Sequence, residues 1–171
     1  MARGLGAALV LAAAGMLGAI IARAYQERPR ALRALQSALA MLLTEIVYGA
    51  TPMPDALDRV ARRTPAPVGR FFAAAASYLR AEPGAGTAQA WRRALADPPG
   101  WCLTADDEAV LADLGNCLGR SDAADQEKHL RLALAQLQRL QAQAEAERDV
   151  HVRLWRYLGA GAGAALVLLL Y

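Results

Sequence analysis

The sequence predicts an all-α fold: an antiparallel bundle of about six helices flanked by N- and C-terminal transmembrane helices. Apolar residues recur every three or four positions between residues 28 and 150, which is the spacing of amphipathic helices. No stretch of that region alternates with the period of two and the β-branched residues that strands favour. Long apolar segments occupy both ends of the chain, at residues 4–22 and 154–171.

The composition agrees with a small domain that carries membrane segments. The chain has 171 residues, enough for one compact domain with short appendages. Hydrophobic residues make up 56% and charged residues only 20%, and the mean hydropathy is +0.17. Soluble domains of this size are usually less apolar and more highly charged. The net charge of +3 comes from arginine, because Lys128 is the single lysine.

Residues 4–22 form the first predicted transmembrane helix. They carry no charge, and nineteen helical residues span about 28 Å, close to the thickness of the hydrocarbon core. A cleaved signal peptide is the alternative. The length of the run favours an anchor, as do the arginines that follow it, which hold the next segment in the cytoplasm.

Residues 154–171 form the second predicted transmembrane helix, with Arg156 reaching back to the interface. The alternative is a hydrophobic tail buried in the soluble core or in a partner. Arginines also precede this segment, at Arg148 and Arg153. Both arginine clusters thus face the middle of the chain, which predicts that residues 23–156 lie in the cytoplasm.

The first bundle helix contains the apolar series from Leu32 to Ile46. Gly49 is expected to end it in a left-handed conformation. Thr51 then serves as the N-cap of a short second helix, with Pro52 at its first position.

The next three helices are delimited by residues of the same kinds, namely prolines, N-cap residues and glycine. Pro65 and Pro67 lead into a helix over Phe71–Leu79, and Thr87 caps the helix that contains Trp91. Thr104 with Asp107 three residues later resembles a capping box for a helix over Val110–Leu118, which Gly119 ends.

The last helix is capped by Ser121 or Asp122 and meets no glycine or proline before Gly159. Running unbroken into the membrane, it spans about 70 Å. That exceeds the height of the bundle, so the polar stretch Gln138–Asp149 is expected to stand apart as a stalk.

Nothing in the sequence predicts an enzyme, a cofactor or a metal site. Lys128 follows acidic residues rather than a glycine-rich loop, which excludes a phosphate-binding loop of the G-x-x-x-x-G-K-[ST] type. Cys102 and Cys117 lack metal-ligand spacing. His129 and His151 lie about 33 Å apart along one helix. The remaining arginines are interspersed with acidic residues, which indicates a solvated face or attraction to anionic lipid and no nucleic-acid partner.

Two stretches go beyond composition. The first, residues 43–57, reads L-T-E-I-V-Y-G-A-T-P-M-P-D-A-L, and the second, residues 114–122, reads L-G-N-C-L-G-R-S-D and continues through Gln126, Lys128 and His129. Together with the two apolar ends they resemble the stage III sporulation protein AB family of endospore-forming bacteria. Met53 and Asp55 stand where leucine and glutamate are commoner in that family.

The resemblance implies a non-enzymatic scaffold of the secretion-like complex that links mother cell and forespore. The family's bundle is similar to the inner-membrane platform protein of type II secretion and type IV pilus systems. The implied partners are a cytoplasmic secretion-type ATPase, the other membrane subunits of the sporulation complex and the lipid bilayer. The implied location is the mother-cell-derived membrane around the forespore.

This chain departs from a platform protein in having one bundle and two predicted spans in place of two bundles and three spans. The mechanism of a platform protein therefore applies to this chain only in part. Oligomerisation of the chain is one way to supply the missing copies. The alternative function is a membrane-anchored helical sensor or regulator that binds a small ligand. Such a module requires a large internal pocket with convergent polar groups, whereas a scaffold requires a filled core.

Glu45 is the sharpest candidate for a partner-binding residue, because it is the only charge between Ala38 and Tyr48. It either pairs internally, with an arginine, Lys128 or water, or is offered to a partner. The turn after it either only ends and starts helices or also forms a recognition surface. Lys128 and His129 are within intrahelical reach of Asp125. The predicted partner-binding residues are Glu45, Tyr48, Gly49, Thr51, Pro52, Pro54, Asp55, Ser121, Asp122, Gln126, Lys128 and His129.

Overall fold

The computed structural model describes the backbone of residues 26–170, except 83, 85, 120 and 121, and the side chains as far as residue 150. The predicted span at residues 4–22 lies outside the described residues. The described part contains six helices and no strand, which confirms the all-α prediction. They are a helix over residues 26–47, α2 (Met53–Arg63), α3 (Val68–Ala81), α4 (Thr87–Ala96), α5 (Ala105–Cys117) and α6 (Ala123–Leu170).

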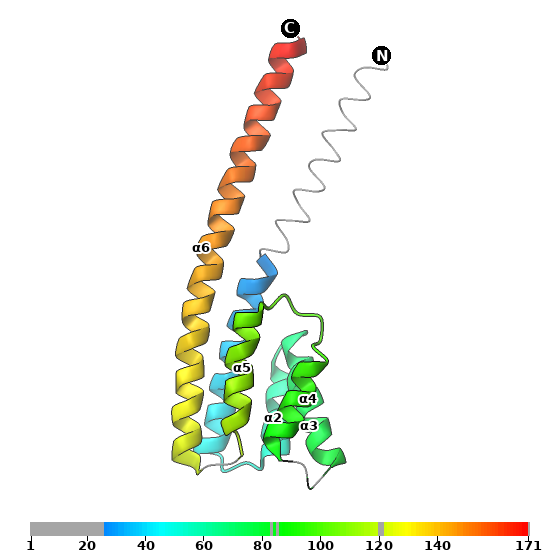
Figure 1. Cartoon of the computed structure of the whole chain (residues 1–171), viewed down its shortest axis with the longest axis vertical. Helices are drawn as coiled ribbons and strands as arrows, with labels where there is room; N and C mark the ends of the chain where they lie inside the picture. The colour runs from blue at the N-terminus through cyan, green and yellow to red at the C-terminus, as the bar shows by residue number, and fades with distance from the viewer. Residues whose placement is uncertain (1–25, 83, 85, 120–121, 171) are drawn as a thin grey trace.

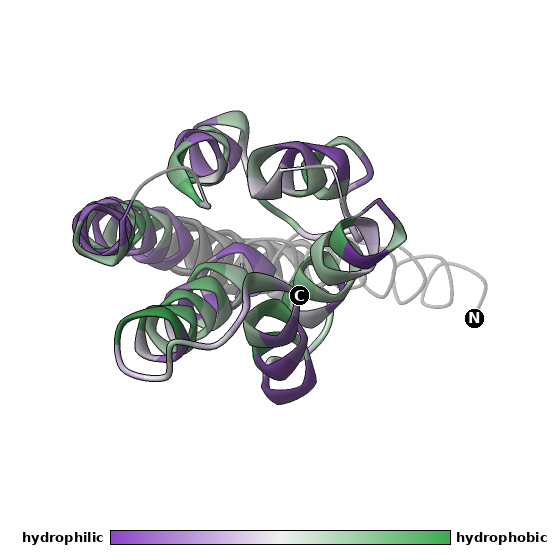
Figure 2. Cartoon of the chain, turned by 90° about the horizontal axis from the view of Figure 1, so that it is seen from below, coloured by the Kyte–Doolittle hydropathy of each residue, from purple (hydrophilic) through white to green (hydrophobic). Residues whose placement is uncertain are grey.

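Successive helices run in opposite directions and pack against their neighbours in chain order (Figure 1). We call the end of the bundle at residues 48–52, 118–119 and 122 the distal end, and the end at residues 26–30 and 97–104 the proximal end. Helix α6 extends beyond the proximal end, on the side opposite to the distal loops (Figure 1). In the view from below, the helices surround a common interior with hydrophilic residues on their outward sides (Figure 2).

The core is built from helix faces that are apolar at every third or fourth position. On helix 26–47, Leu32, Leu35, Leu39 and Leu42 are fully buried, as the helical period predicts. Together with buried apolar residues of α2 to α6, these leucines form one hydrophobic core.

An aromatic cluster fills the part of the core between α3 and α5. The ring of Phe71 meets Trp91 edge to face at 4.8 Å between centroids and lies 5.1 Å from Trp101. The indole Nε1 of Trp91 donates to the carbonyl of Leu111 at 2.7 Å, so this buried polar atom is satisfied. Gly115 on α5 lies directly against Trp91, and a side chain there would collide with the indole.

Several predicted helix boundaries are confirmed. Thr104 and Asp107 form a complete capping box at the start of α5. Gly119 has a φ of +74° just after α5, where glycine avoids the steric cost of a side chain. The carboxylate of Asp122 accepts from the backbone N–H of Asp125 at 2.8 Å and caps α6. Ser121, the alternative cap, lies outside the described residues.

Three boundary predictions were wrong by one residue. The left-handed residue after helix 26–47 is Ala50, with a φ of +43°, and not Gly49. The N-cap of α2 is Pro52 rather than Thr51, and no side chain caps this helix; the Thr51 hydroxyl donates to Glu45. The N-cap of α4 is Gly86, and Thr87 is the first helical residue.

The expected stalk over Gln138–Asp149 was also wrong. Gln36 donates to the side chain of Gln141 at 2.7 Å, and Arg33 pairs with Glu145 at 3.0 Å. Ala144 is buried between the two helices. The polar residues of this stretch therefore pack α6 against helix 26–47, since polar side chains can pair across a helix interface as well as face solvent.

The backbone of α6 stays helical through Leu170, and the side chains of the second predicted span, from residue 154 on, lie outside those described. Within the described part of the chain, no helix combines the length and the apolar character that crossing a membrane requires.

Candidate partner-binding site

The structure brings both motif stretches to the distal end of the bundle. Helix 26–47 ends there and α2 begins, and α5 ends there beside the start of α6 (Figure 1). Gly119 packs closely on Thr87, since a Cβ on this glycine would lie 2.4 Å from the threonine Oγ1. The loop between α5 and α6 is thereby held against the start of α4.

The side-chain contacts between helix 26–47 and α6 show how the two stretches approach each other. Arg28 contacts Glu147 near the proximal end, and Gln36 contacts Gln141 nearer the middle. Residue numbers thus rise along helix 26–47 as they fall along α6, so the two helices are antiparallel. The end of helix 26–47, with Tyr48 just beyond it, accordingly lies alongside the first turns of α6 (Figure 1).

Glu45 forms an internal pair. Its Oε2 accepts from the Thr51 hydroxyl and from Nη1 of Arg59, both at 2.8 Å, and its side chain is 17% exposed. The hydrogen bond from Thr51 lowers the pKa of Glu45 most; burial opposes this, and Arg59 lowers the pKa further. Of the two alternatives for this carboxylate, the structure forms the arginine pair.

The turn after Glu45 is tightly built and exposes one aromatic ring. The N–H groups of Tyr48 and Gly49 both donate to the carbonyl of Thr44, and the N–H of Thr51 donates to the carbonyl of Glu45. A Cβ on Gly49 would lie 2.7 Å from the Glu45 carbonyl oxygen, so the turn needs glycine for close approach. The side chain of Tyr48 is 78% exposed, and large apolar rings at this exposure are candidates for partner contact.

Arg80 of α3 contacts the first turn of α2, at Pro54 and Asp55. Nη2 of Arg80 donates to Asp55 at 3.0 Å and to Asp58 at 2.9 Å. The hydrogen bond to Arg80 is the largest effect that lowers the pKa of Asp58. No local pattern in the sequence singles out Arg80, which lies 25 residues from Asp55.

The second stretch begins at the end of α5 and continues onto the first turns of α6. Asp122 and Lys128 are exposed, while Gln126 and His129 are half-buried. The predicted pairing of Asp125 with Lys128 or His129 is not formed among these described residues. Glu127 carries the ion pair of this turn, and its partner is Arg131 at 2.7 Å.

An ion pair at the proximal end was missed by the sequence analysis. Arg28 binds both carboxylate oxygens of Asp107, which is fully buried, and also contacts Thr104 and Glu147. In the sequence, Arg28 is one of the arginines after the first predicted transmembrane helix that predict its orientation, and Asp107 is predicted to be part of a capping box. The only sequence signal for this pair is an acidic residue at the third position of a helix, which capping already explains.

No group of three or more His, Cys, Asp or Glu side chains in the described part of the chain is placed to hold a metal ion. Both cysteines are free thiols; Cys102 is exposed and Cys117 half-buried. At the distal end, Glu45 and Asp55 are engaged in structural pairs, whereas Tyr48, Asp122 and Lys128 are exposed.

Comparison with known proteins gives the same assignment as the motifs. The family model described as stage III sporulation protein AB matches residues 3–171. The chain is 35% identical over 133 residues to "Stage III sporulation protein AB" of Bacillus subtilis (strain 168), covering 75% of each chain. A solved structure titled "Stage III sporulation protein AB (SpoIIIAB)" matches at 34% identity with a TM-score of 0.68, covering 72% of this chain and 98% of that one. The predicted resemblance is thereby confirmed, and this chain belongs to the stage III sporulation protein AB family.

Proposed function

We propose that this sporulation protein is a non-enzymatic membrane scaffold whose distal end docks a partner of the sporulation complex, namely a cytoplasmic secretion-type ATPase. The observation that carries the proposal is the meeting of both motif stretches at one end of the bundle (Figure 1). Residues 43–57 and 114–129 are far apart in the chain, and their common position gives them one surface to share. The other membrane subunits of the complex are proposed partners of the remaining faces, and a second copy of the chain is a further one.

Membrane attachment by both ends of the chain is part of this proposal. The apolar segments at residues 4–22 and 154–171, each with arginines on its bundle side, support it. In the described part, α6 runs toward its C-terminal end away from the distal loops (Figure 1). A scaffold anchored in this way in the membrane around the forespore presents its distal end to the cytoplasm.

The ion pairs of the bundle favour a role as a scaffold rather than as an enzyme. Glu45 is held by Arg59, Asp55 by Arg80 and Asp107 by Arg28. Each pair joins two helices, so these carboxylates have a structural task. The small-ligand alternative requires convergent polar groups in an internal pocket, and the part of the core around Phe71 and Trp91 is instead filled by aromatic rings.

The docking surface is tested with two exposed residues, Tyr48→Ala and Lys128→Glu. Both variants of the full-length chain should keep their melting temperature, since exposed substitutions change stability by less than about 0.5 kcal/mol. Co-purification of the secretion-type ATPase should fall. The matched controls are Val150→Ala, which also truncates an exposed apolar side chain, and Arg139→Glu, which also reverses an exposed charge on α6.

The docking proposal fails if neither Tyr48→Ala nor Lys128→Glu reduces co-purification, or if the control variants reduce it equally. Membrane placement is tested separately. With Cys102 and Cys117 replaced by serine, single cysteines are introduced at Gly84 and Asp97, in the loops after α3 and α4. An impermeant thiol reagent should label neither in intact cells and both after permeabilisation; labelling in intact cells contradicts the cytoplasmic placement.

A further inference from the structure

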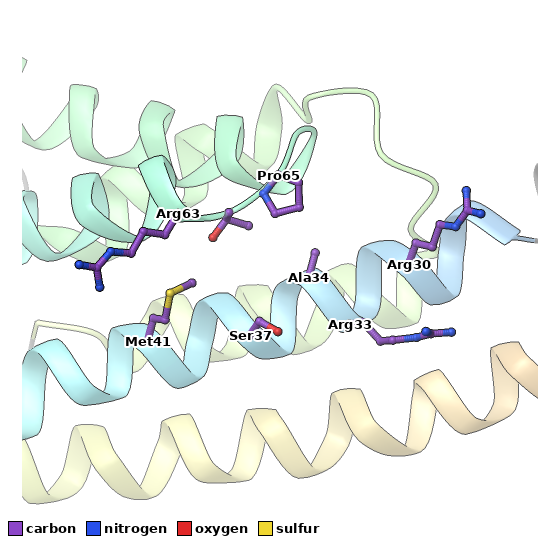
Figure 3. Close-up of a pocket in the computed structure, with 8 residues that line it drawn as sticks. Arg30, Arg33, Ala34, Ser37, Met41, Arg63 and Pro65 are labelled. Carbon is purple, nitrogen blue, oxygen red and sulfur yellow. The ribbon is translucent and has the colours of Figure 1, made fainter.

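A surface groove follows helix 26–47 from Glu27 to Met41, on the side that faces the corner between α2 and α3. One hollow of about 450 Å³ lies between Ala34, Ser37 and Met41 on the helix and Arg63, Thr64 and Pro65 on the corner (Figure 3). A second hollow of about 340 Å³ continues from it past Pro67 to Trp101 and Cys102. The two share Arg30, Ala34 and Pro65 and form one continuous depression. We call it the cationic groove.

Arginines stand at both ends of the first hollow. Figure 3 shows Arg30 at one end and Arg63 at the other, with Ala34, Ser37 and Met41 along the floor between them. Arg30 and Met41, eleven residues apart on one helix, are separated by about 16 Å. The groove therefore has an apolar middle and a positive charge at each end.

The arginines retain donors for a further partner. Arg30 pairs with Glu27 and Arg33 with Glu145 through one nitrogen each, and their side chains are 63% and 54% exposed. A guanidinium carries five N–H donors, so one ion pair leaves most of them available. Arg63 is exposed and makes no ion pair among the described residues.

We propose that the cationic groove binds a segment of a partner protein that is apolar in its middle and acidic at both ends. Carboxylates on the segment would meet Arg30 and Arg63, and its apolar residues would cover Ala34, Met41 and Pro65. The floor from Arg30 to Met41, about 16 Å long, corresponds to ten or eleven residues of a helix or to five of an extended chain. Guanidinium–carboxylate pairs at the two ends give the orientation, and apolar burial between them contributes affinity.

The arrangement of the arginines favours a peptide over a lipid headgroup. A single phosphate is best bound by donors that converge on one point, whereas Arg30 and Arg63 lie at opposite ends of the hollow (Figure 3). The site is separate from the distal end and depends neither on docking there nor on membrane attachment.

The test uses the full-length chain and fluorescein-labelled synthetic peptides of roughly 14 residues, which as a helix are longer than the floor of about 16 Å from Arg30 to Met41. One peptide has glutamates at both ends and leucine and alanine between them; in the other, lysines replace the glutamates. Fluorescence anisotropy should show binding of the acidic peptide and not of the basic one. In the double variant Arg30→Glu/Arg63→Glu, the Kd for the acidic peptide should rise at least about tenfold, and the basic peptide should begin to bind.

The matched control is Arg92→Glu/Arg139→Glu, which makes the same change in net charge at two exposed arginines outside the groove. It should leave the Kd for the acidic peptide within about twofold, because surface charges far apart are screened. An equal loss in both double variants shows nonspecific charge attraction and overturns the proposal. Absence of acidic-peptide binding to the unmodified chain also overturns it, including the case in which vesicles of phosphatidylcholine and phosphatidylglycerol bind through Arg30 and Arg63 instead.

A single introduced cysteine provides a second readout that locates the bound peptide. Ser37→Cys, in a chain whose Cys102 and Cys117 are replaced by serine, places a thiol in the first hollow between Arg30 and Arg63, whereas Cys117 is not among the residues that line the groove. Saturating acidic peptide should slow alkylation of the cysteine at position 37 and leave that of Cys117 in the unmodified chain unchanged. Binding without protection at position 37, or with equal protection of Cys117, places the peptide elsewhere and overturns the proposal.

Discussion

Arg28 and Asp107, 79 residues apart in the chain, form a two-pronged ion pair that closes the proximal end of the bundle. Nε of Arg28 donates to Oδ2 of Asp107 at 2.8 Å, and Nη2 donates to Oδ1 at 3.0 Å. The carboxylate is fully buried, and Oδ2 also accepts the backbone N–H of Thr104 at 2.9 Å. Arg28 in turn reaches Glu147 on α6. Through Asp107 and Glu147, Arg28 thus joins helix 26–47 to both α5 and α6.

The first prediction concerns removal of the charge of Asp107. Asp107→Asn leaves the guanidinium of Arg28 without its buried partner, which typically costs about 3 kcal/mol or more when a buried pair is broken. Partial exposure of Arg28 and its contact with Glu147 place the expected loss near the lower end. The measurement is the free energy of unfolding in urea. Asp113→Asn, at an exposed position of the same helix, is the control and should change stability by less than about 0.5 kcal/mol; equal effects of the two variants would contradict the prediction.

The second prediction is the pH dependence of the same pair. Burial alone would raise the pKa of Asp107, but hydrogen bonds from Arg28 and Thr104 outweigh it and hold the pKa below the ordinary value of 3.8. Below about pH 4 the unfolded chain therefore binds a proton that the folded chain does not, and acidification favours unfolding. The stability difference between the unmodified chain and Asp107→Asn should stay constant above about pH 5 and shrink below about pH 4. Urea unfolding across this range tests it, and a difference that grows on acidification would show that the pKa of Asp107 is not lowered.

The third prediction is that Glu45 and Thr51 are energetically coupled. Because the Thr51 hydroxyl donates to Glu45, either Glu45→Gln or Thr51→Val disrupts the same interaction. The double variant should therefore lose less stability than the sum of the two single variants. Thermal unfolding of the four proteins gives the coupling. Repeating the cycle with Glu45→Gln and the distant Thr104→Val serves as the control and should give additive losses; additivity in both cycles would rule out a functional Glu45–Thr51 contact.

The fourth prediction concerns Gly115. A Cβ on this residue would lie 2.2 Å from Cδ1 of Trp91, and the fully buried indole has little room to move. Gly115→Ala should therefore destabilise the bundle by about 1–3 kcal/mol, although alanine is the better helix former. Gly84→Ala is the control, since a Cβ at that position meets no atom within 4 Å, and its melting temperature should hold or rise slightly. A Gly115→Ala variant as stable as Gly84→Ala would mean that the Trp91 contact is loose.

Much of the fold was predictable because its signals are local. The apolar series that begins at Leu32 predicts a buried helical face, and Leu32 is fully buried. The capping box of Thr104 and Asp107 and the left-handed Gly119 also depend on residues within four positions of one another. The errors were local as well: Thr51 was predicted to cap α2, where its hydroxyl would accept a backbone N–H, but that hydroxyl donates to Glu45 and the N-cap is the next residue, Pro52.

The candidate site was predictable in its residues and not in its arrangement. The motifs identified Glu45 and Tyr48 in one stretch and Lys128 in the other. That these stretches share the distal end follows from the alternating direction of the helices and the packing of helix 26–47 on α6. The partner of Glu45 was left open among several cations, and the structure selected Arg59.

The sequence by itself determined the helical class, several helix boundaries and the family, because periodicity, capping and motif spacing act between neighbouring residues. Tertiary structure decided which distant charges pair, as Arg28 does with Asp107 and Arg80 with Asp55, and it placed Arg30 and Arg63 at opposite ends of the first hollow of the cationic groove. The physical reason is that the relative rotation and offset of packed helices arise from the whole core. A charge that is one turn away along its own helix reaches a different neighbour, and no local pattern records that choice.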